Sequence, residues 1–395
     1  MKTGFINKKF ETKKVYIALS LFTLAAVTLA ILISNGHLFQ VFFFPDPDDT
    51  GMDFFNSLID VHTREPYGKY EVIYPPFANL FFYVLTLFIP DSVKAGWPAN
   101  HEAVKGIVGT REDLRLTQSA ILLFLFFLIL TLFGIAVMIH RETKSYPLTF
   151  CLILSAGMLI GLERGNVVIL AFLLTFFFVK HYNDENRITS ELALLALAAA
   201  FGFKLFPCVF GILLLKDRKF AAAGRAVLYA VLFTVLPTFL FGGPSCLLTW
   251  FELLTGYGNV ATTSSSGSSG FPVPLNLVLA AGLLIILLVI FFAQKNGKPL
   301  LVLKHSQILF LTAYLSLLVN EGAGGYNLVF FLIPFLAFLQ EEKTISRYNC
   351  IEFLVYLVAL LPAGINQITY LFFFLYLAGC GCRILASKKS GKAEN

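Results

Sequence analysis

Long apolar runs, separated by short polar and charged segments, fill most of this chain. The first run extends from Val15 to Ser34 and is long enough to cross the ~30 Å hydrocarbon core of a bilayer. Membrane-spanning helices are expected near residues 15–34, 74–90, 118–140, 147–162, 165–180, 191–215, 226–241, 275–293, 307–320, 326–340, 350–363 and 366–385. Several of these ranges are shorter than the ~17–25 residues of a standard span, which indicates tilted or broken helices that line a cavity. The pattern predicts an all-α polytopic membrane protein, a single integral membrane domain over residues 1–395 with about 12 (11–13) spanning helices.

The composition agrees with this expectation. Hydrophobic residues make up 57% of the chain and charged residues 14%, against roughly 25% charged residues in a soluble domain, and the mean hydropathy is +0.77. So few charges cannot cover a water-facing surface, which argues against a soluble enzyme or a disordered chain. The net charge of +6 does not indicate a nucleic-acid partner, because the basic residues form short clusters between apolar runs, as in cytoplasmic loops.

The distribution of basic residues predicts an orientation. The first apolar run is too long for a secretory signal and no small-residue cleavage site follows it, so a retained first span is expected. With twelve spans, the basic tail 1–14 and the tail 386–395 are both cytoplasmic, and the acidic loop 35–73 is outside. The same map places two basic pairs outside, against the positive-inside rule: Arg141 with Lys144, and Lys180 with Arg187. A bacterial cytoplasmic membrane is the expected location, with a eukaryotic endoplasmic reticulum membrane as the alternative.

The first outer loop, residues 35–73, carries the most promising chemistry. It interleaves apolar residues with five acids, Asp46, Asp48, Asp49, Asp53 and Asp60. Such a pattern beside a membrane predicts a short helix that lies on the outer interface, where a carboxylate can meet a lipid-linked substrate. The alternatives are a solvated loop, or a loose divalent-cation site formed by the clustered aspartates.

Short motifs along the chain follow one another in a recognisable order. Asp53 is followed by Pro66-Tyr67 and Tyr74-Pro75-Pro76, then by Gly165-Asn166, Lys204-Leu205-Phe206-Pro207 and Tyr326-Asn327. In this order and spacing they resemble glycosyltransferase family 87, the polyprenol-phosphate-mannose-dependent mannosyltransferases of the GT-C superfamily. The resemblance covers roughly residues 15–340. This chain departs from the family pattern in three places: Glu163-Arg164-Gly165-Asn166 stands where Gly-Gln is common, a polar insertion occupies about 91–117, and Tyr326 has no neighbouring His.

The resemblance implies a GT-C-like bundle with a long first outer loop. It also implies a reaction in which a hexose, mannose by resemblance, moves with inversion from a polyprenyl-phosphate carrier to a glycolipid or glycan acceptor on the outer face. A carboxylate of the first outer loop is the general base in such enzymes. Asp53 matches that position, and Asp60 and Asp49 are the second and third choices. No cofactor is expected and no metal ligand set is assigned, although a requirement for a divalent metal stays open.

The leaving phosphate needs cationic partners. Lys204 is the first candidate, because a lysine inside an apolar span is costly unless it faces a cavity or a partner. Arg164 and Arg64 are further candidates. Lys204 can instead extend toward the interface, and Glu163 with Arg164 can form a structural ion pair. The substrate pocket is expected to include Tyr67, Tyr74, Tyr326 and Asn327.

Two other classes of protein remain possible on the sequence. One is a flippase or secondary transporter for a lipid-linked or small anionic solute, and the other is a polysaccharide polymerase or ligase. A transporter would carry its polar residues near mid-membrane on paired broken helices. This chain concentrates carboxylates in one outer loop, which favours the enzyme.

Overall fold

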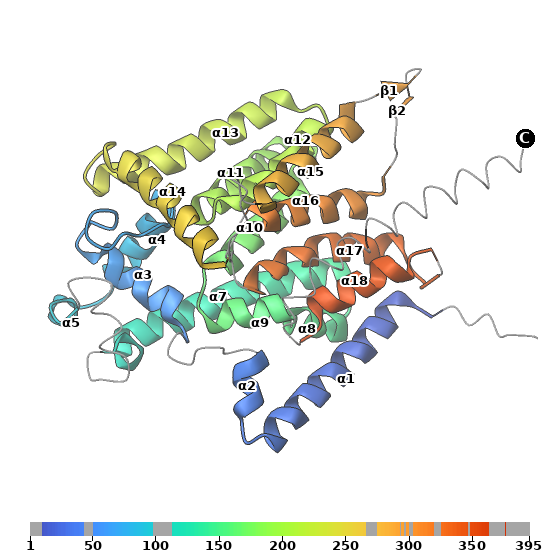
Figure 1. Cartoon of the computed structure of the whole chain (residues 1–395), viewed down its shortest axis with the longest axis horizontal. Coiled ribbons are helices and arrows are strands. Elements are labelled where there is room, and N and C mark those ends of the chain that lie inside the picture. The colour runs from blue at the N-terminus through green and yellow to red at the C-terminus, as the bar shows by residue number, and fades with distance from the viewer. Residues whose placement is uncertain are drawn as a thin grey trace, which may run out of the picture.

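The computed structural model of the protein describes residues 10–42, 50–97, 113–265, 275–292, 294–295, 298–299, 303–319, 325–346, 348–362 and 376. Within these residues the regular secondary structure is helical apart from one antiparallel pair of two-residue strands and one isolated β-bridge (Figure 1), so the predicted all-α class is confirmed. Asp46, Asp48 and Asp49 lie outside the described residues, as do residues 1–9, the tail 386–395 and, except for residue 376, the predicted last span near 366–385.

The first half of the chain contains α1 (Thr12–Ile33), α2 (His37–Phe42), α3 (Met52–His62), α4 (Pro76–Thr86), α5 (Asp91–Lys94), η2 (Leu114–Leu116), α7 (Gln118–Thr143), α8 (Tyr146–Ile153), α9 (Ala156–Glu163), α10 (Val168–His181) and α11 (Arg187–Phe203). The second half contains η3 (Phe206–Gly211), α12 (Ile212–Lys216), α13 (Phe220–Val235), η4 (Leu236–Leu240), α14 (Cys246–Ser265), α15 (Leu275–Phe292), β1 (Gln294–Lys295), β2 (Lys298–Pro299), α16 (His305–Val319), η5 (Gly325–Phe331), α17 (Leu332–Glu341) and α18 (Cys350–Leu360).

Three of these segments are long and apolar enough to cross a membrane by themselves: α1, α7, and α13 continued by η4. A fourth candidate is the pair α8 and α9, which is bent by 57° at the break between them. Large apolar side chains such as Phe22, Phe133 and Phe239 remain exposed on the long helices, as expected of surfaces that face lipid. Figure 1 shows α1 and α13 on opposite flanks of the molecule. The structure is thus that of a polytopic membrane protein.

Shorter apolar helices fill the space between these flanks. Nearly every residue of α16 is buried, which is typical of a helix that is apolar on all sides. The helix α9 lies so close to η5 that a Cβ atom on Gly157 would be 2.5 Å from the backbone nitrogen of Val329. Only glycine permits this approach, so the bent pair is anchored to the C-terminal half of the bundle.

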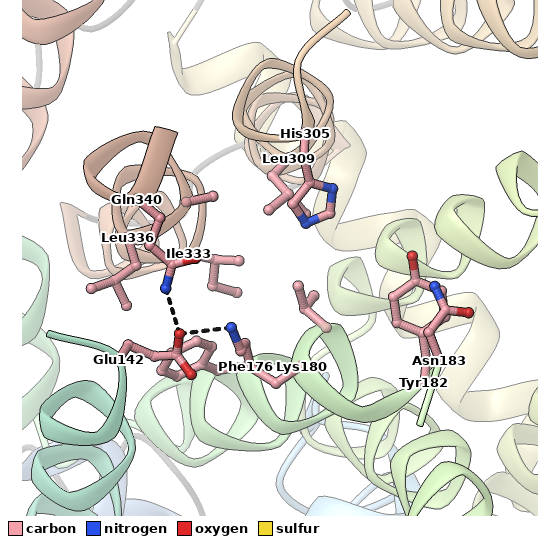
Figure 2. Close-up of a pocket in the computed structure, with 12 residues that line it drawn as sticks. Glu142, Phe176, Lys180, Tyr182, Asn183, His305, Leu309, Ile333, Leu336 and Gln340 are labelled. Carbon is pink, nitrogen blue, oxygen red and sulfur yellow. Dashed lines mark hydrogen bonds and ion pairs between the residues drawn. The ribbon is translucent and has the colours of Figure 1, made fainter. Parts of the chain in front are cut away.

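Polar helix ends gather at the end of the molecule where α1 begins, which we call the N-terminal end. The Thr12 hydroxyl donates to the Glu342 carbonyl at 2.7 Å, and Lys13 Nζ donates to the Thr143 carbonyl at 3.2 Å. Glu142 precedes Thr143 at this end, and Figure 2 shows its carboxylate between Lys180 and Gln340, from each of which it accepts a hydrogen bond at 2.7 Å. Glu142, Lys180 and Gln340 line a cavity of about 220 Å³ and join α7, α10 and α17.

We call the opposite end of the molecule the Asp53 end. There the chain follows a different path from the one that the sequence predicted. The segment predicted to span near 74–90 forms only the 11-residue helix α4. Its Tyr83 hydroxyl accepts from Arg64, and Lys94, in the next helix α5, lines a cavity together with His62. Both partners lie just beyond or at the end of α3, so α4 does not cross the bundle. It returns to the end at which it began.

Because α4 does not cross, the helices that follow it, beginning with α7, run in the opposite direction to that in the predicted map. Arg115, just before α7, donates to the Thr50 carbonyl at 3.4 Å, whereas Thr143 at the other end of α7 contacts Lys13. The basic residues around Arg141 and Lys180 therefore lie at the N-terminal end, together with Lys13. The map that placed them on the opposite side was wrong because it counted α4 as a span.

Candidate functional site

The helix α3 presents Asp53 at its first turn. The sequence predicted a short helix in the acidic loop, and the structure confirms it over Met52–His62, with Phe54, Phe55 and Leu58 buried. Gly51 precedes the helix with a left-handed φ of 71°, and its N–H donates to the Glu163 carbonyl at 2.9 Å. The Asp53 N–H donates to the Arg164 carbonyl at 3.2 Å. The start of α3 is therefore fastened to the end of α9.

The side chain of Asp53 is held by two residues from the α9–α10 turn. Arg164 donates from Nε to Oδ2 at 2.9 Å and from Nη2 to Oδ1 at 2.8 Å, and Asn166 donates from Nδ2 to Oδ2 at 2.6 Å. Arg164 thus pairs with Asp53, from which it is separated by 111 positions in the chain. The Asp53 side chain remains 18% exposed. A carboxylate has roughly four acceptor sites, so these three bonds leave room for one further donor.

Gly165 makes this double contact possible. Its φ is +64°, in the left-handed region, and a Cβ atom there would lie 2.6 Å from the Phe124 ring and 2.9 Å from the Phe54 Cβ. A tight turn between Arg164 and Asn166 directs both side chains to the same carboxylate. Gly165-Asn166 was identified as a motif in the sequence, but Asn166 was assigned no role. The proximity of Asn166 to Arg164 in the sequence was the signal that could have included it in the site.

Two aromatic rings surround the Lys204 ammonium next to this carboxylate. Lys204 follows the last residue of α11, and its Nζ lies 4.3 Å from the centre of the Tyr74 ring and 5.8 Å from that of Tyr326. It is also close enough to Asp53 and Arg164 to interact with their charges. We call Asp53, Tyr74, Arg164, Asn166, Lys204 and Tyr326 the Asp53 cluster.

The turn that carries Tyr74 is held by hydrogen bonds to its backbone. The Tyr67 hydroxyl donates to the Tyr74 carbonyl at 3.1 Å, and the Trp250 indole donates to the Ile73 carbonyl at 3.0 Å. Tyr67 therefore stabilises this turn by a hydrogen bond, and its predicted contact with substrate stays a prediction. The pKa of the Tyr74 hydroxyl is raised well above its usual value, first by burial and then by the nearby Asp53 carboxylate. Tyr74 thus contributes a neutral hydroxyl to the cluster.

Other predicted site residues lie away from the Asp53 cluster or lack a visible role in it. Arg64 is exposed, follows the far end of α3, and donates to the Tyr83 hydroxyl at 2.8 Å, so the structure does not bring it to Asp53. Asp60 is buried on α3 and is only 6% exposed. Asn327 is 3% exposed, and its amide has no hydrogen-bond partner among the described residues.

The chemistry available in the cluster is that of a group transfer involving an anion. A carboxylate can accept a proton, two fixed cations can neutralise an anion such as a phosphate, and aromatic faces can pack against a sugar or an apolar chain. Within the described ranges, no group of three or more His, Cys, Asp or Glu side chains is placed to hold a metal ion.

Comparison with known proteins adds a family to this geometry. The family of sequences described as glycosyltransferase family 87 matches residues 73–320, which is more than half of the chain. The match includes Tyr74, Arg164, Asn166 and Lys204 but begins after Asp53. No curated protein and no solved structure matches the chain. The chain belongs to glycosyltransferase family 87 and is a membrane glycosyltransferase.

Proposed function

We propose that the protein transfers a hexose, mannose in our proposal, from a polyprenyl-phosphate carrier to a hydroxyl of a glycolipid or glycan acceptor. The observation that carries this proposal is the Asp53 cluster, in which a carboxylate and two cations from three separate segments meet at one end of the bundle. A base beside a phosphate-binding pair is what transfer from a lipid phosphate requires. Membership of the family supports the transferase class but does not identify the donor or the acceptor.

In the proposed mechanism Asp53 is the general base. Its carboxylate accepts the proton of the acceptor hydroxyl while the hydroxyl oxygen attacks the anomeric carbon from the face opposite the phosphate. The bond between the anomeric carbon and the phosphate oxygen breaks, its electron pair leaves with the polyprenyl phosphate, and the anomeric configuration inverts. Arg164 and Asn166 hold the carboxylate in one orientation, which favours reaction because a positioned base contributes roughly 10²–10⁴-fold.

Lys204 and Arg164 are proposed to bind the donor phosphate. Both are charged and lie next to the base, so the negative charge that grows on the leaving phosphate is stabilised where it forms. Because these side chains supply the charge, we propose that no cofactor is needed. Tyr326 and Asn327 are proposed to contact the substrate, since a buried amide without a partner is stabilised by a ligand hydroxyl.

The proposed orientation places the Asp53 cluster at the outer face of a bacterial cytoplasmic membrane. The basic residues at the N-terminal end, among them Lys13, Arg141 and Lys180, then face the cytoplasm. Because α4 remains at the Asp53 end, Arg141 and Lys180 are on the cytoplasmic side and no longer violate the positive-inside rule.

The predicted span 191–215 doubles back, because Lys204 lies in the Asp53 cluster whereas Asp217 accepts from the Tyr182 hydroxyl near Lys180. This extra crossing offsets the loss of α4, so both chain ends are proposed to be cytoplasmic.

The test is sugar transfer in proteoliposomes that contain the full-length protein. Radiolabelled polyprenyl-phosphate hexoses serve as donors and a lipid extract as acceptor, and wild type is compared with Asp53→Asn at equal folded amounts. We expect transfer by wild type, a loss of at least roughly 10²-fold in the variant, and no effect of dialysis against a chelator.

Other outcomes point to other assignments. Equal transfer by both proteins would keep the enzyme and move the base to Asp60 or Asp49. Loss of activity on chelation would add a metal. Failure of intact protein to transfer from any donor would favour the flippase or transporter.

A further inference from the structure

A second cavity at the Asp53 end lies between the far end of α3 and the segment that follows α4. Its volume is about 440 Å³, within the roughly 300–1,000 Å³ of small-molecule sites. One side is formed by His62, Lys69 and Tyr70, and the other by Asp91, Lys94 and Trp97. The second side belongs to the polar insertion that the sequence showed beginning near residue 91. We call these six residues the Trp97 pocket.

The charged groups of the pocket favour an anion. Lys69 and Lys94 contribute two positive charges, and Asp91 contributes one negative charge. Lys94 is only 20% exposed and is paired at 2.7 Å with Asp91, whose side chain is 97% exposed. A pair with so exposed a carboxylate is weak, so a ligand anion can replace Asp91 as the partner of Lys94.

The aromatic groups favour a sugar. The Trp97 side chain is 9% exposed, and its Nε1 is buried with no hydrogen-bond partner among the described residues. An indole N–H only donates, so it is stabilised by an acceptor such as a hydroxyl oxygen. The His62 ring is 5.1 Å from the Trp97 ring and 6.2 Å from the Tyr70 ring, measured between ring centres. Apolar ring surface with a few fixed polar groups is typical of a site for a small polar ligand.

His62 adds a hydrogen-bond acceptor to the pocket. Its Nδ1 is bonded to the Ile59 carbonyl, which only accepts, so Nδ1 carries the proton. Burial is the main cause that lowers the pKa of His62 below its usual 6.5, and the charges of Lys69 and Lys94 act in the same direction. The imidazole is therefore neutral at pH 7, and its Nε2 is an acceptor for a hydroxyl.

We propose that the Trp97 pocket binds an anionic sugar unit of the acceptor, one that carries a phosphate or a carboxylate. This inference rests on the proposed function and narrows its acceptor class. His62 lies nine positions after Asp53 on α3, about 14 Å at 1.5 Å per residue. The unit in the pocket is accordingly a different one from the unit whose hydroxyl reacts.

Direct binding tests the inference without any donor. The chain has two tryptophans, so Trp250→Phe leaves Trp97 as the only tryptophan reporter in the full-length protein. Its fluorescence is followed during titration with mannose 6-phosphate, glucuronate, neutral mannose and inorganic phosphate. We expect a saturable change with at least one anionic sugar, and roughly tenfold weaker binding of neutral mannose and of inorganic phosphate. If mannose 6-phosphate binds more tightly than glucuronate, the charged group of the bound sugar unit is a phosphate; if glucuronate binds more tightly, it is a carboxylate.

Lysine variants locate the binding site. Lys69→Gln and Lys94→Gln should each weaken binding roughly tenfold, while Lys94→Arg, which keeps the charge, should restore it. Lys14→Gln is the matched control, because Lys14 is an exposed lysine near the N-terminal end with a similar i,i+3 partner.

Three results would overturn the inference: no saturable change with either anionic sugar, equal binding of inorganic phosphate alone, or indifference to both lysine variants. Because no transfer is measured, loss of binding leaves the proposed transferase function standing. Conversely, a protein that binds the anionic sugar but transfers no hexose from a polyprenyl phosphate would refute the proposed reaction, keep the pocket as an anionic-sugar site and remove its assignment to the acceptor.

Discussion

At the scale of single residues, the central feature is a carboxylate held by a guanidinium and an amide. Arg164 meets both oxygens of Asp53 with two nitrogens, and Asn166 adds a third bond. A planar guanidinium matches a carboxylate in this way, whereas an ammonium supplies charge at one point. A lysine at position 164 would therefore keep the positive charge but lose the two-point contact that orients the Asp53 carboxylate.

Arg164→Lys should lower kcat while changing the donor KM little. The charge near the phosphate is kept, but the carboxylate loses its fixed orientation, and a small misplacement of a catalytic group costs on the order of 10²-fold. Steady-state kinetics in proteoliposomes measure this. Arg225→Lys is the control, since Arg225 pairs with Glu191 near the N-terminal end. An unchanged kcat in Arg164→Lys would show that the pair does not orient the base.

Lys204→Ala should act mainly on the donor. Loss of the ammonium removes a partner of the leaving phosphate, so we expect the donor KM to rise roughly tenfold with the acceptor KM unchanged. Lys219→Ala is the matched control, because Lys219 also lies over a tyrosine ring, at 5.8 Å from Tyr182, but near the N-terminal end. If the donor KM stays at the wild-type value, Lys204 has a structural role only.

At the scale of elements, close helix packing and one tight turn bring the site together. The bent pair α8–α9 lies against η5, and the turn at Gly165 carries Arg164 and Asn166 to the start of α3. In each case a side chain larger than glycine would meet backbone atoms or large rings. The elements around the site thus depend on two glycines at positions that tolerate no Cβ atom.

Gly157→Ala should destabilise the protein. Its Cβ atom would lie 2.5 Å from the Val329 nitrogen and 2.9 Å from the Leu328 carbonyl carbon, and overpacking of this kind costs about 1–3 kcal/mol of the free energy of unfolding. Gly224→Ala is the control, because Gly224 lies in α13 with no atom within 4 Å of an added Cβ, and alanine there should stabilise the helix by up to about 1 kcal/mol. Thermal melting in detergent compares them, and equal melting temperatures would argue against the α9–η5 contact.

At the scale of the whole molecule, the two ends have different character. The N-terminal end gathers lysine, arginine and glutamate pairs such as Lys180 with Glu142 and Lys304 with Glu342. The Asp53 end carries the Asp53 cluster and the Trp97 pocket. This division follows the positive-inside rule if the N-terminal end faces the cytoplasm.

Cysteine labelling distinguishes this arrangement from the map with twelve spans. In a variant whose native cysteines are replaced, Arg141→Cys should react with a membrane-impermeant maleimide only after the cells are opened. Arg64→Cys, just after α3, should react in intact cells. The map with α4 as a span places both positions outside, so labelling of Arg141→Cys in intact cells would contradict the structure.

The sequence predicted much of this molecule from local patterns. The apolar runs identified a membrane protein, the interleaved acids predicted α3, and Pro75-Pro76 marked the start of α4. The predictions of a membrane protein and of these two helices succeeded because composition and neighbouring residues determine whether a segment is apolar and where a helix begins. Lys204 was singled out because a charge inside an apolar segment is costly without a partner, and Asp53 because it matches the carboxylate of the resembled family. The catalytic roles of both residues stay predictions.

The tertiary structure alone decided how those segments are arranged. An apolar stretch of 11 residues, such as α4, has the same composition whether it crosses the bundle or returns to its starting end. The pairing of Asp53 with Arg164 and Asn166 joins residues 111 and 113 positions apart, which local patterns do not encode. The sequence thus determined the membrane setting and the candidate charges, whereas packing between distant helices decided which charges meet and at which end of the molecule.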